Sequence, residues 1–226
     1  MHYIGVDCGR VNDYAAIDIF EDRLIHRPPT IMPWHVRQSM QEVPDRLLRV
    51  YDAIHLEQIR GVSYPQVVRR VKQIVDNPRV SQDYVLVVDS TGVGIAIIDM
   101  MVCAGLFPIG VTFTAGREVT QGEQGYNVPK RDLVVNIQML FQLDRINISS
   151  KLKLAPVFRD QLKGFTKDAH KGYETYGNDE KLVGNDDLVT AGAVVLWYAE
   201  KTHASEIGLP NKEPDPFDPA RHGLGT

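Results

Sequence analysis

A strand–helix–strand segment in the middle of the chain constrains the fold more than any other part of the sequence. Tyr84 to Val88 is an uninterrupted apolar run that ends in Asp89, and a glycine-containing turn, Thr91 to Gly94, leads into an apolar helix that reaches Cys103. A further apolar strand, Phe107 to Phe113, follows. Strands that are covered on both faces read as continuous apolar runs, so this order predicts a parallel βαβ crossover.

The residues that precede this unit predict additional strands. His2 to Asp7 is a short apolar strand, and Tyr14 to Phe20 is a second one. The polar stretch Glu21 to Arg23 predicts a tight connection into Leu24–His26, and therefore a β-hairpin. Tyr51 to Ile59 alternates apolar and polar residues like an edge strand.

The remaining periodic segments predict helices. Ser63 is the expected N-cap of a helix with a buried stripe of valine and isoleucine residues, which ends at Asn77-Pro78. Three further helices are predicted: one from Pro129 to Phe141, one over 155–162, and one from Asn185, its N-cap, to about Thr202. A short strand is predicted over 146–148 and a surface excursion or hairpin over 165–183. Together they predict a mixed α/β sheet, with an antiparallel N-terminal meander before the parallel βαβ unit and helices on both faces.

Length and composition predict one globular domain. The chain has 226 residues, of which 43% are apolar and 24% charged, as in ordinary globular proteins. We expect this domain to span residues 1–203 and a Pro-rich, disordered tail to span residues 204–226. The sequence has no run of 18 apolar residues, no signal-peptide pattern and no CxxC pair, which predicts a cytoplasmic protein without a membrane span. The net charge of −4 argues mildly against nucleic-acid binding, but the tail carries two of those four charges.

Acidic residues stand where three apolar elements end or begin. Asp7 ends the first strand, Asp89 ends the central strand, and Asp186-Asp187 opens the last helix. If the first and central strands are parallel neighbours, Asp7 and Asp89 project from positions about 5 Å apart. Carboxylates that close need a cation to stay ionised together, and all-oxygen ligation favours Mg²⁺ or Mn²⁺. Each acid alone is more typical of a turn or a helix cap, so the prediction of a metal site depends on their combination.

Four motifs that contain or adjoin these acids follow one another along the chain. They are Ile4-Gly5-Val6-Asp7-Cys8-Gly9 with Asp13-Tyr14, then Val87-Val88-Asp89-Ser90-Thr91-Gly92-Val93-Gly94, then Val128-Pro129-Lys130-Arg131-Asp132-Leu133, and finally Gly184-Asn185-Asp186-Asp187-Leu188-Val189. In this order they resemble the first strand, the second acidic motif, the helix after the fifth strand and the third acidic motif of a known family. That family is the nuclease domain of the tailed-bacteriophage terminase large subunit, which has a ribonuclease H-like fold. The resemblance covers roughly residues 2–203.

The resemblance implies a two-metal endonuclease that cuts concatemeric double-stranded viral DNA during genome packaging in the host cytoplasm. By position, Asp7, Asp89 and Asp187 would be the catalytic metal ligands and Asp186 a fourth or supporting one. Asp187 is favoured within its pair because it shares a helix face with three residues that we expect to point inward, namely Ala191, Val194 and Tyr198. The implied cofactors are two divalent cations, Mg²⁺ or Mn²⁺. We expect Asp7 to bridge both ions.

The implied partners are double-stranded DNA, an ATPase motor domain or subunit, the small terminase subunit and the portal, and no membrane. The chain itself has no GxxxxGK[ST] phosphate loop, so translocation would need that separate motor. Lys130 and Arg131, at a helix start, are candidates for holding a DNA phosphate, and Lys163 and Lys167 belong to a basic series over 151–171 that would face DNA. Both basic sets are also typical of a solvated surface.

Other functions remain open from the sequence. A junction resolvase of the same fold would cut only branched DNA, and a non-catalytic domain would keep the fold for assembly. The Gly92-Val93-Gly94 turn resembles part of a dinucleotide-binding loop, but Ile97 stands where the third glycine belongs. An actin-like or sugar-kinase fold also begins with Asp-x-Gly, although such proteins place two domains around a nucleotide.

Overall fold

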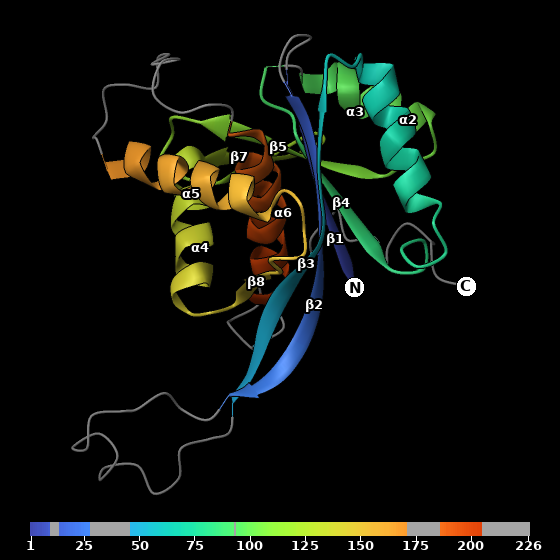
Figure 1. Ribbon diagram of the computed structural model, residues 1–226. Helices are drawn as coiled ribbons and strands as arrows, with labels where there is room; N and C mark the ends of the chain where they lie inside the picture. The colour runs from blue at the N-terminus through green and yellow to red at the C-terminus, as the bar shows by residue number, and fades with distance from the viewer. Residues whose placement is uncertain (10–13, 28–45, 93, 171–185, 205–226) are drawn as a thin grey trace, which may run out of the picture.

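An eight-stranded sheet with helices on both faces organises the molecule. The computed structural model describes residues 1–9, 14–27, 46–92, 94–170 and 186–204. The strands are β1 (His2–Cys8), β2 (Tyr14–Arg27), β3 (Arg46–Arg60), β4 (Tyr84–Asp89), β5 (Pro108–Thr114), β6 (Thr120–Gly122), β7 (Gly125–Pro129) and β8 (Ile146–Ile148). The helices are α2 (Tyr64–Val75), α3 (Gly94–Cys103), α4 (Lys130–Gln142), α5 (Ala155–His170) and α6 (Asp187–Ala204). Figure 1 shows α2 and α3 on one face of the sheet and α4, α5 and α6 on the other.

The strand order is β6-β7-β5-β4-β1-β2-β3-β8, so β1 and β4 lie in the middle of the sheet. β1 pairs antiparallel with β2 and parallel with β4, and β4 in turn pairs parallel with β5. The predicted mixed sheet, with an antiparallel start and a parallel βαβ unit, is therefore confirmed. The hairpin β6–β7 was not predicted from the sequence, because its strands are too short to show a period.

The connection predicted over Glu21–Arg23 is wrong. β2 passes through these residues without a break and pairs along its length with β3. The charges belong to cross-strand ion pairs: the Arg23 guanidinium lies 2.5 Å from Asp52, and Arg49 pairs with Asp22. A polar stretch without glycine or proline can therefore continue a strand whose neighbour supplies the opposite charges. The long β2–β3 pair extends past the rest of the sheet (Figure 1).

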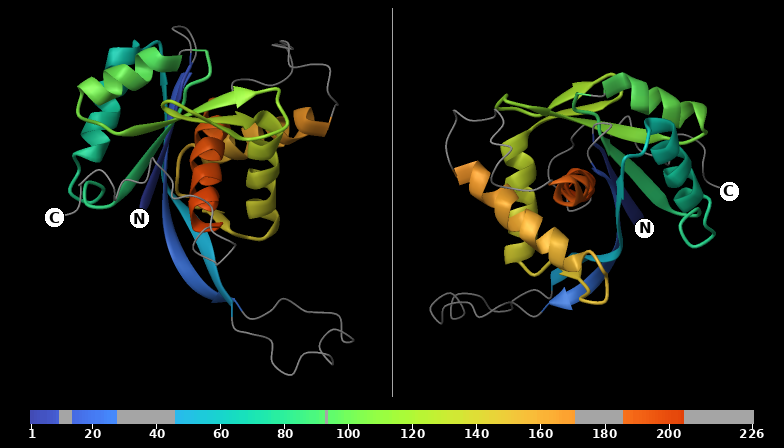
Figure 2. Two further views of the ribbon diagram at one scale, coloured as in Figure 1. Left: turned by 180° about the vertical axis from the view of Figure 1, so that it is seen from behind. Right: turned by 45° about the horizontal axis from the view of Figure 1, so that its top comes forward.

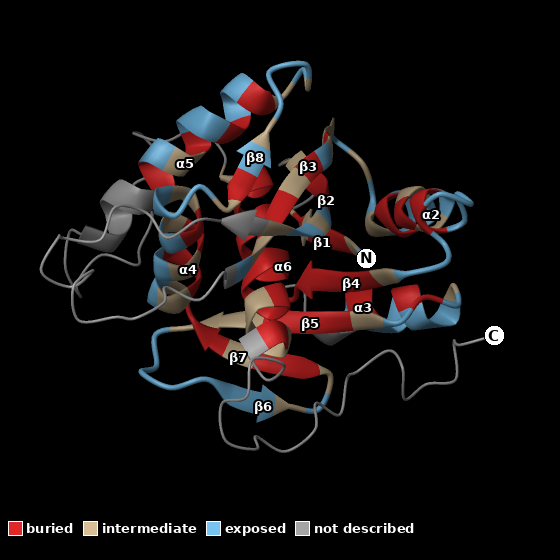
Figure 3. Ribbon diagram, turned by 90° about the horizontal axis from the view of Figure 1, so that it is seen from below, coloured by how far each residue is buried: buried red, intermediate tan, exposed pale blue. Residues whose placement is uncertain are grey.

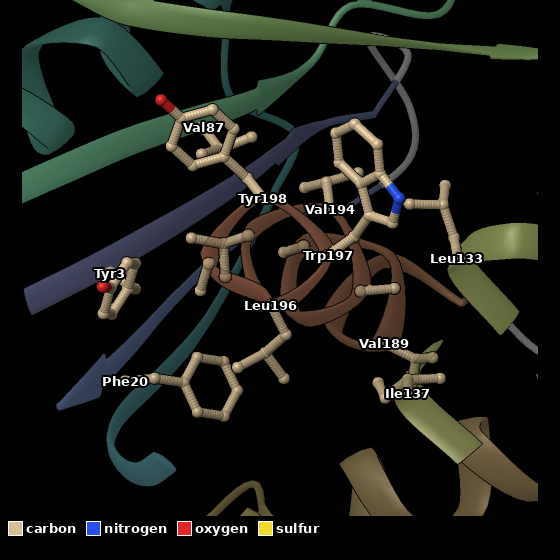
Figure 4. Packing of buried hydrophobic residues seen from close by; sticks show 14 of the residues in the cluster. Tyr3, Phe20, Val87, Leu133, Ile137, Val189, Val194, Leu196, Trp197 and Tyr198 are labelled. Carbon is tan, nitrogen blue, oxygen red and sulfur yellow. The ribbon is translucent and has the colours of Figure 1, made fainter. Parts of the chain in front are cut away.

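Helix α6 is the centre of the hydrophobic core on its face of the sheet. Figure 2 shows it between the sheet and helices α4 and α5, and Figure 3 shows that most of its length is buried. Val194, Trp197 and Tyr198 are among its core residues, and Leu133 and Ile137 of α4 pack against it (Figure 4). A helix that is apolar on nearly all sides needs such a surrounding, because any exposed side would leave apolar surface in water.

The other predicted elements differ from the structure mainly in their boundaries. The helix after Ser63, the strand 146–148 and the helix after Pro129 are present as α2, β8 and α4. The helix predicted over 155–162 continues to His170, into the segment expected to be a surface excursion. The N-cap of the last helix is Asp186, one residue after the predicted Asn185, and Ala204, the first residue of the expected tail, still belongs to α6. The rest of that excursion and residues 205–226 lie outside the described residues. Among the helices of the described ranges, none combines the length and the apolar character needed to cross a membrane.

Candidate active site

Asp7 and Asp89 occupy adjacent positions at the ends of the two central strands. The parallel register pairs Asp7 of β1 directly with Asp89 of β4. Side chains alternate along a strand, and Val6 and Cys8 belong to the core on the α2–α3 face. Asp7 therefore projects on the opposite face, toward α6, and Asp89 does the same because it follows Val88, another residue of the α2–α3 core.

Helix α6 brings a third carboxylate to this edge. Its backbone lies against β1 at Gly5, where a Cβ atom would meet the Ala191 carbonyl group. At its other end, the Tyr3 hydroxyl lies 2.5 Å from Nε2 of His203. α6 therefore runs antiparallel to β1, and Asp187, one turn before Ala191, reaches the end of the strand that carries Asp7. Asp187 is buried, as its predicted helix face requires.

Asp186 is the most exposed acid of this group and lies beside Lys130. The Asp186 carbonyl oxygen accepts the N–H of Thr190, so Asp186 is the N-cap residue of α6. Its half-exposed carboxylate lies 3.9 Å from Nζ of Lys130, the first residue of α4. The Lys130 ammonium also lies 5.5 Å from the centre of the Phe165 ring, where a cation–π interaction stabilises it.

Electrostatic coupling joins the four carboxylates. Burial raises the pKa of Asp7 well above its ordinary value, and the negative charges of Asp89, Asp187 and Asp186 raise it further. A hydrogen bond from the Gly9 backbone opposes this effect only in part. Ionisation of Asp7 therefore depends on a positive charge being brought to the cluster.

A turn after β4 holds Asp89 in place. The Thr91 N–H donates to Oδ1 of Asp89 at 2.8 Å, and Thr91 is itself bound through its hydroxyl by the N–H of Phe113. Gly92 then adopts a φ of +78°, which lets the chain turn sharply toward α3. Burial raises the pKa of Asp89 to about 6, although its bonds to Thr91 and the charge of Lys130 lower it.

The donor set fits a hard divalent cation in its chemistry. The coupled groups offer only carboxylate oxygens, which suit Mg²⁺ or Mn²⁺ rather than Zn²⁺. Within the described residues, however, no three acidic, histidine or cysteine side chains already converge as ligands around one point. Carboxylates that raise one another's pKa repel one another without a cation, so ligation requires side-chain rotation toward a common ion.

The predicted DNA-binding residues do not form one group. Lys130 lies at the acidic cluster, whereas the Arg131 guanidinium is bound to Asp132 at 3.1 Å and to the Arg117 carbonyl at 3.0 Å. Lys163 is exposed on α5 and lies 2.8 Å from Asp160. The side chain of Lys167 lies outside the described residues.

Two residues near the cluster were not identified from the sequence. Gln161 of α5 is buried, and its side-chain oxygen accepts the N–H groups of Leu188 and Val189 in the first turn of α6. Asp18 of β2 lies opposite Gly5 and is fully buried, and neither of its carboxylate oxygens has a hydrogen-bond partner in the described structure. Burial raises the pKa of Asp18, which favours its neutral form. No local signal marks either residue, because Gln161 bonds to α6, which begins more than 25 residues further along the chain, and Asp18 lies against Gly192 of the same helix.

Comparison with known proteins identifies the fold. Neither a protein-family model nor a curated protein sequence matches the chain. Among solved structures, the large terminase nuclease from the thermophilic phage G20c is similar, with a TM-score of 0.51, 17% sequence identity and coverage of 86% of this chain and 80% of that one. The same nuclease with bound cobalt gives a TM-score of 0.51, 16% identity and coverage of 87% and 80%. The chain therefore has the ribonuclease H-like fold of a large terminase nuclease, and the fold predicted from the four motifs is confirmed.

Proposed function

We propose that this protein is a metal-dependent nuclease that hydrolyses phosphodiester bonds in DNA. The observation that carries the proposal is the placement of Asp7 and Asp89 side by side at the ends of two parallel central strands, with Asp187 coupled to them from α6. The fold shared with the large terminase nuclease supports it, since one structure of that nuclease has bound cobalt.

In this proposal Asp7, Asp89 and Asp187 hold two divalent cations, Mg²⁺ or Mn²⁺, and Asp186 supports them. The cations would supply the Lewis acidity that activates water and stabilises the departing oxygen in phosphodiester hydrolysis. Asp7 has the central part because all three other acids raise its pKa. The hydrogen bond from Thr91 keeps Asp89 oriented, and the turns of α6 that follow Asp187 hold the helix against β1.

Lys130 is the residue that we assign to the DNA phosphate. It lies beside Asp186 and is about one-third exposed, and its ammonium group makes a cation–π contact with the Phe165 ring. Arg131 and Lys163 already have acidic or carbonyl partners on the protein, so they contribute mainly to the general attraction of the backbone.

The role in cutting concatemeric viral DNA during packaging is the more specific part of the proposal. It follows the resemblance to terminase nucleases and includes an ATPase motor domain or subunit, the small terminase subunit and the portal as partners. A pull-down of each partner with this chain, followed by cleavage of concatemeric DNA by the assembled complex, tests that part separately from the chemistry.

The chemistry is tested with supercoiled plasmid in Mn²⁺, in Mg²⁺ and in EDTA, alongside Asp7→Asn, Asp89→Asn and Asp187→Asn. We expect nicking that needs the metal and falls at least about 100-fold in each variant. Asp99→Asn, which changes an acid of α3 outside the cluster, is the matched control and should cleave normally.

Full activity in EDTA or in the three variants would exclude this function. A four-way junction and a linear duplex of the same sequence are cleaved in parallel. Cleavage of the junction alone would instead identify a junction resolvase of the same fold.

A further inference from the structure

The first turn of α6 is capped from another helix. Asp186 is the N-cap residue by its backbone bond to Thr190. An aspartate at this position ordinarily uses its carboxylate to accept the N–H groups two and three residues further on. Here those two donors, Leu188 and Val189, are bound by Oε1 of Gln161 at 3.0 Å and 3.3 Å. The Asp186 carboxylate lies instead on the side of Lys130.

The face of α5 that carries Gln161 follows the course of α6. One turn earlier, Phe158 is buried against Gly192, where an added Cβ would lie 3.1 Å from its ring. One turn later, the ring of Phe165 lies under the Lys130 ammonium. This face of α5 therefore runs alongside α6 toward the acidic cluster. Phe158 lies farthest from the cluster, Gln161 contacts the first turn of α6, and Phe165 contacts Lys130 beside Asp186.

We propose that Gln161 is a positioning residue that caps α6 in place of Asp186 and thereby leaves both carboxylates of the Asp186–Asp187 pair available to the metal. The effect on metal binding rests on the proposed function. The capping exchange itself does not, because it concerns the protein without metal.

The proposal makes a specific statement about Gln161→Met, which keeps the length of the side chain but removes the acceptor. Without Gln161, the Asp186 carboxylate is the acceptor that an N-cap aspartate ordinarily offers to these two N–H groups, so we expect it to turn away from Lys130 and the cluster. Metal affinity falls although the helix remains capped. Outer-shell hydrogen-bonding residues of metal sites typically change affinity by 10–100-fold, so we expect Mn²⁺ to bind roughly tenfold more weakly.

A conservative variant separates positioning from packing. Gln161→Glu retains an oxygen that accepts both N–H groups, so it should bind Mn²⁺ at least as well as the wild type. Tyr51→Phe is the matched control, since it removes one 2.7 Å hydrogen bond, to Glu200, at the other end of α6. That variant should lose some thermal stability without any change in Mn²⁺ affinity.

A double-mutant cycle in EDTA tests the capping exchange directly on the full chain. With Gln161 present, Asp186→Ala removes no cap and should leave the melting temperature nearly unchanged. In the Gln161→Met background the same change removes the replacement cap, and the melting temperature should fall by about 2–4 °C more.

Any one of three results would decide against the proposal. The first is an equal change in melting temperature on Asp186→Ala in both backgrounds, and the second is wild-type Mn²⁺ affinity in Gln161→Met. The third is weaker Mn²⁺ binding in Gln161→Glu than in the wild type. If the wild type bound no Mn²⁺, the proposed nuclease function would fail instead, and the cycle in EDTA would still decide whether Gln161 replaces Asp186 as the cap.

Discussion

At Gly5 the backbone of β1 lies against the backbone of α6, and we expect Gly5→Ala to separate them. A Cβ atom at this position would stand 2.0 Å from the Ala191 carbonyl oxygen and 2.9 Å from Cγ1 of Val195. Side-chain Cβ atoms essentially never approach another heavy atom within 3.0 Å, so α6 must move by at least about 1 Å. The obstacle is backbone, and no rotamer change relieves it.

The displacement has a cost in stability and a larger one in function. Overpacking of a core costs 1–3 kcal/mol, and a backbone obstacle places this variant near about 3 kcal/mol. For a chain of this size that corresponds to a fall in melting temperature of about 6–12 °C. Asp187 lies one turn from the contact, so its carboxylate moves with the helix. A misplacement of about 1 Å in a catalytic group can reduce the rate about 100-fold.

The assay combines thermal unfolding with plasmid nicking in Mn²⁺, measured well below the melting temperature of the variant. Gly116→Ala is the control, because a Cβ there would lie 3.4 Å from Oγ1 of Thr114, an ordinary contact. Its melting temperature should change by no more than about 2 °C. Wild-type stability and cleavage in Gly5→Ala would refute the inference that contact at Gly5 sets the position of Asp187.

Three further perturbations have defined outcomes. The raised pKa of Asp89, about 6, means that the folded protein binds a proton more tightly than the unfolded chain, so this group should make the metal-free protein lose stability as pH rises from about 4 to about 6, by up to about 3 kcal/mol. Thermal melts in EDTA measure this loss, and Asp89→Asn should make it smaller, with Asp7 and Asp18 responsible for the part that remains. Lys130→Met removes the cation that lowers the pKa of Asp89, so an NMR titration of Asp89 should show a higher pKa while DNA cleavage falls about tenfold. Arg145→Met leaves the half-buried Glu200 without its bidentate partner and should cost about 2–4 kcal/mol in urea unfolding, with Mn²⁺ affinity unchanged because this pair lies at the far end of α6.

Local patterns in the sequence were sufficient for the elements that carry the strand acids. The continuous apolar run of β4 identified a strand buried on both faces, and the position of Asp89 at its end followed directly. The helix periodicity of α6 likewise predicted the inward direction of Asp187, which is buried while Asp186 is 47% exposed. These features depend on residues within one or two turns of each other, which is why a single sequence reveals them.

Features that depend on contacts between distant residues were not accessible in this way. The stretch Glu21–Arg23 resembles a turn until Asp52 and Arg49 of β3 supply its charge partners. Gln161 is an ordinary polar residue of an amphipathic helix until its contact with Leu188, 27 residues away, is known. Similarly, the sequence alone does not show that the glycine at position 5 is required by a helix that begins more than 180 residues later.

The pairing of β1 on both sides restricts how the length of this strand can vary in evolution. Each residue from His2 to Asp7 is matched with one residue of β2 and one of β4. A one-residue insertion or deletion would turn Asp7 to the α2–α3 face and bring an apolar neighbour to the acidic edge. A two-residue change would keep the face but displace the carboxylate by about 6.6 Å. In related chains that keep this acidic edge, length differences are therefore expected in the connections between strands and not within β1.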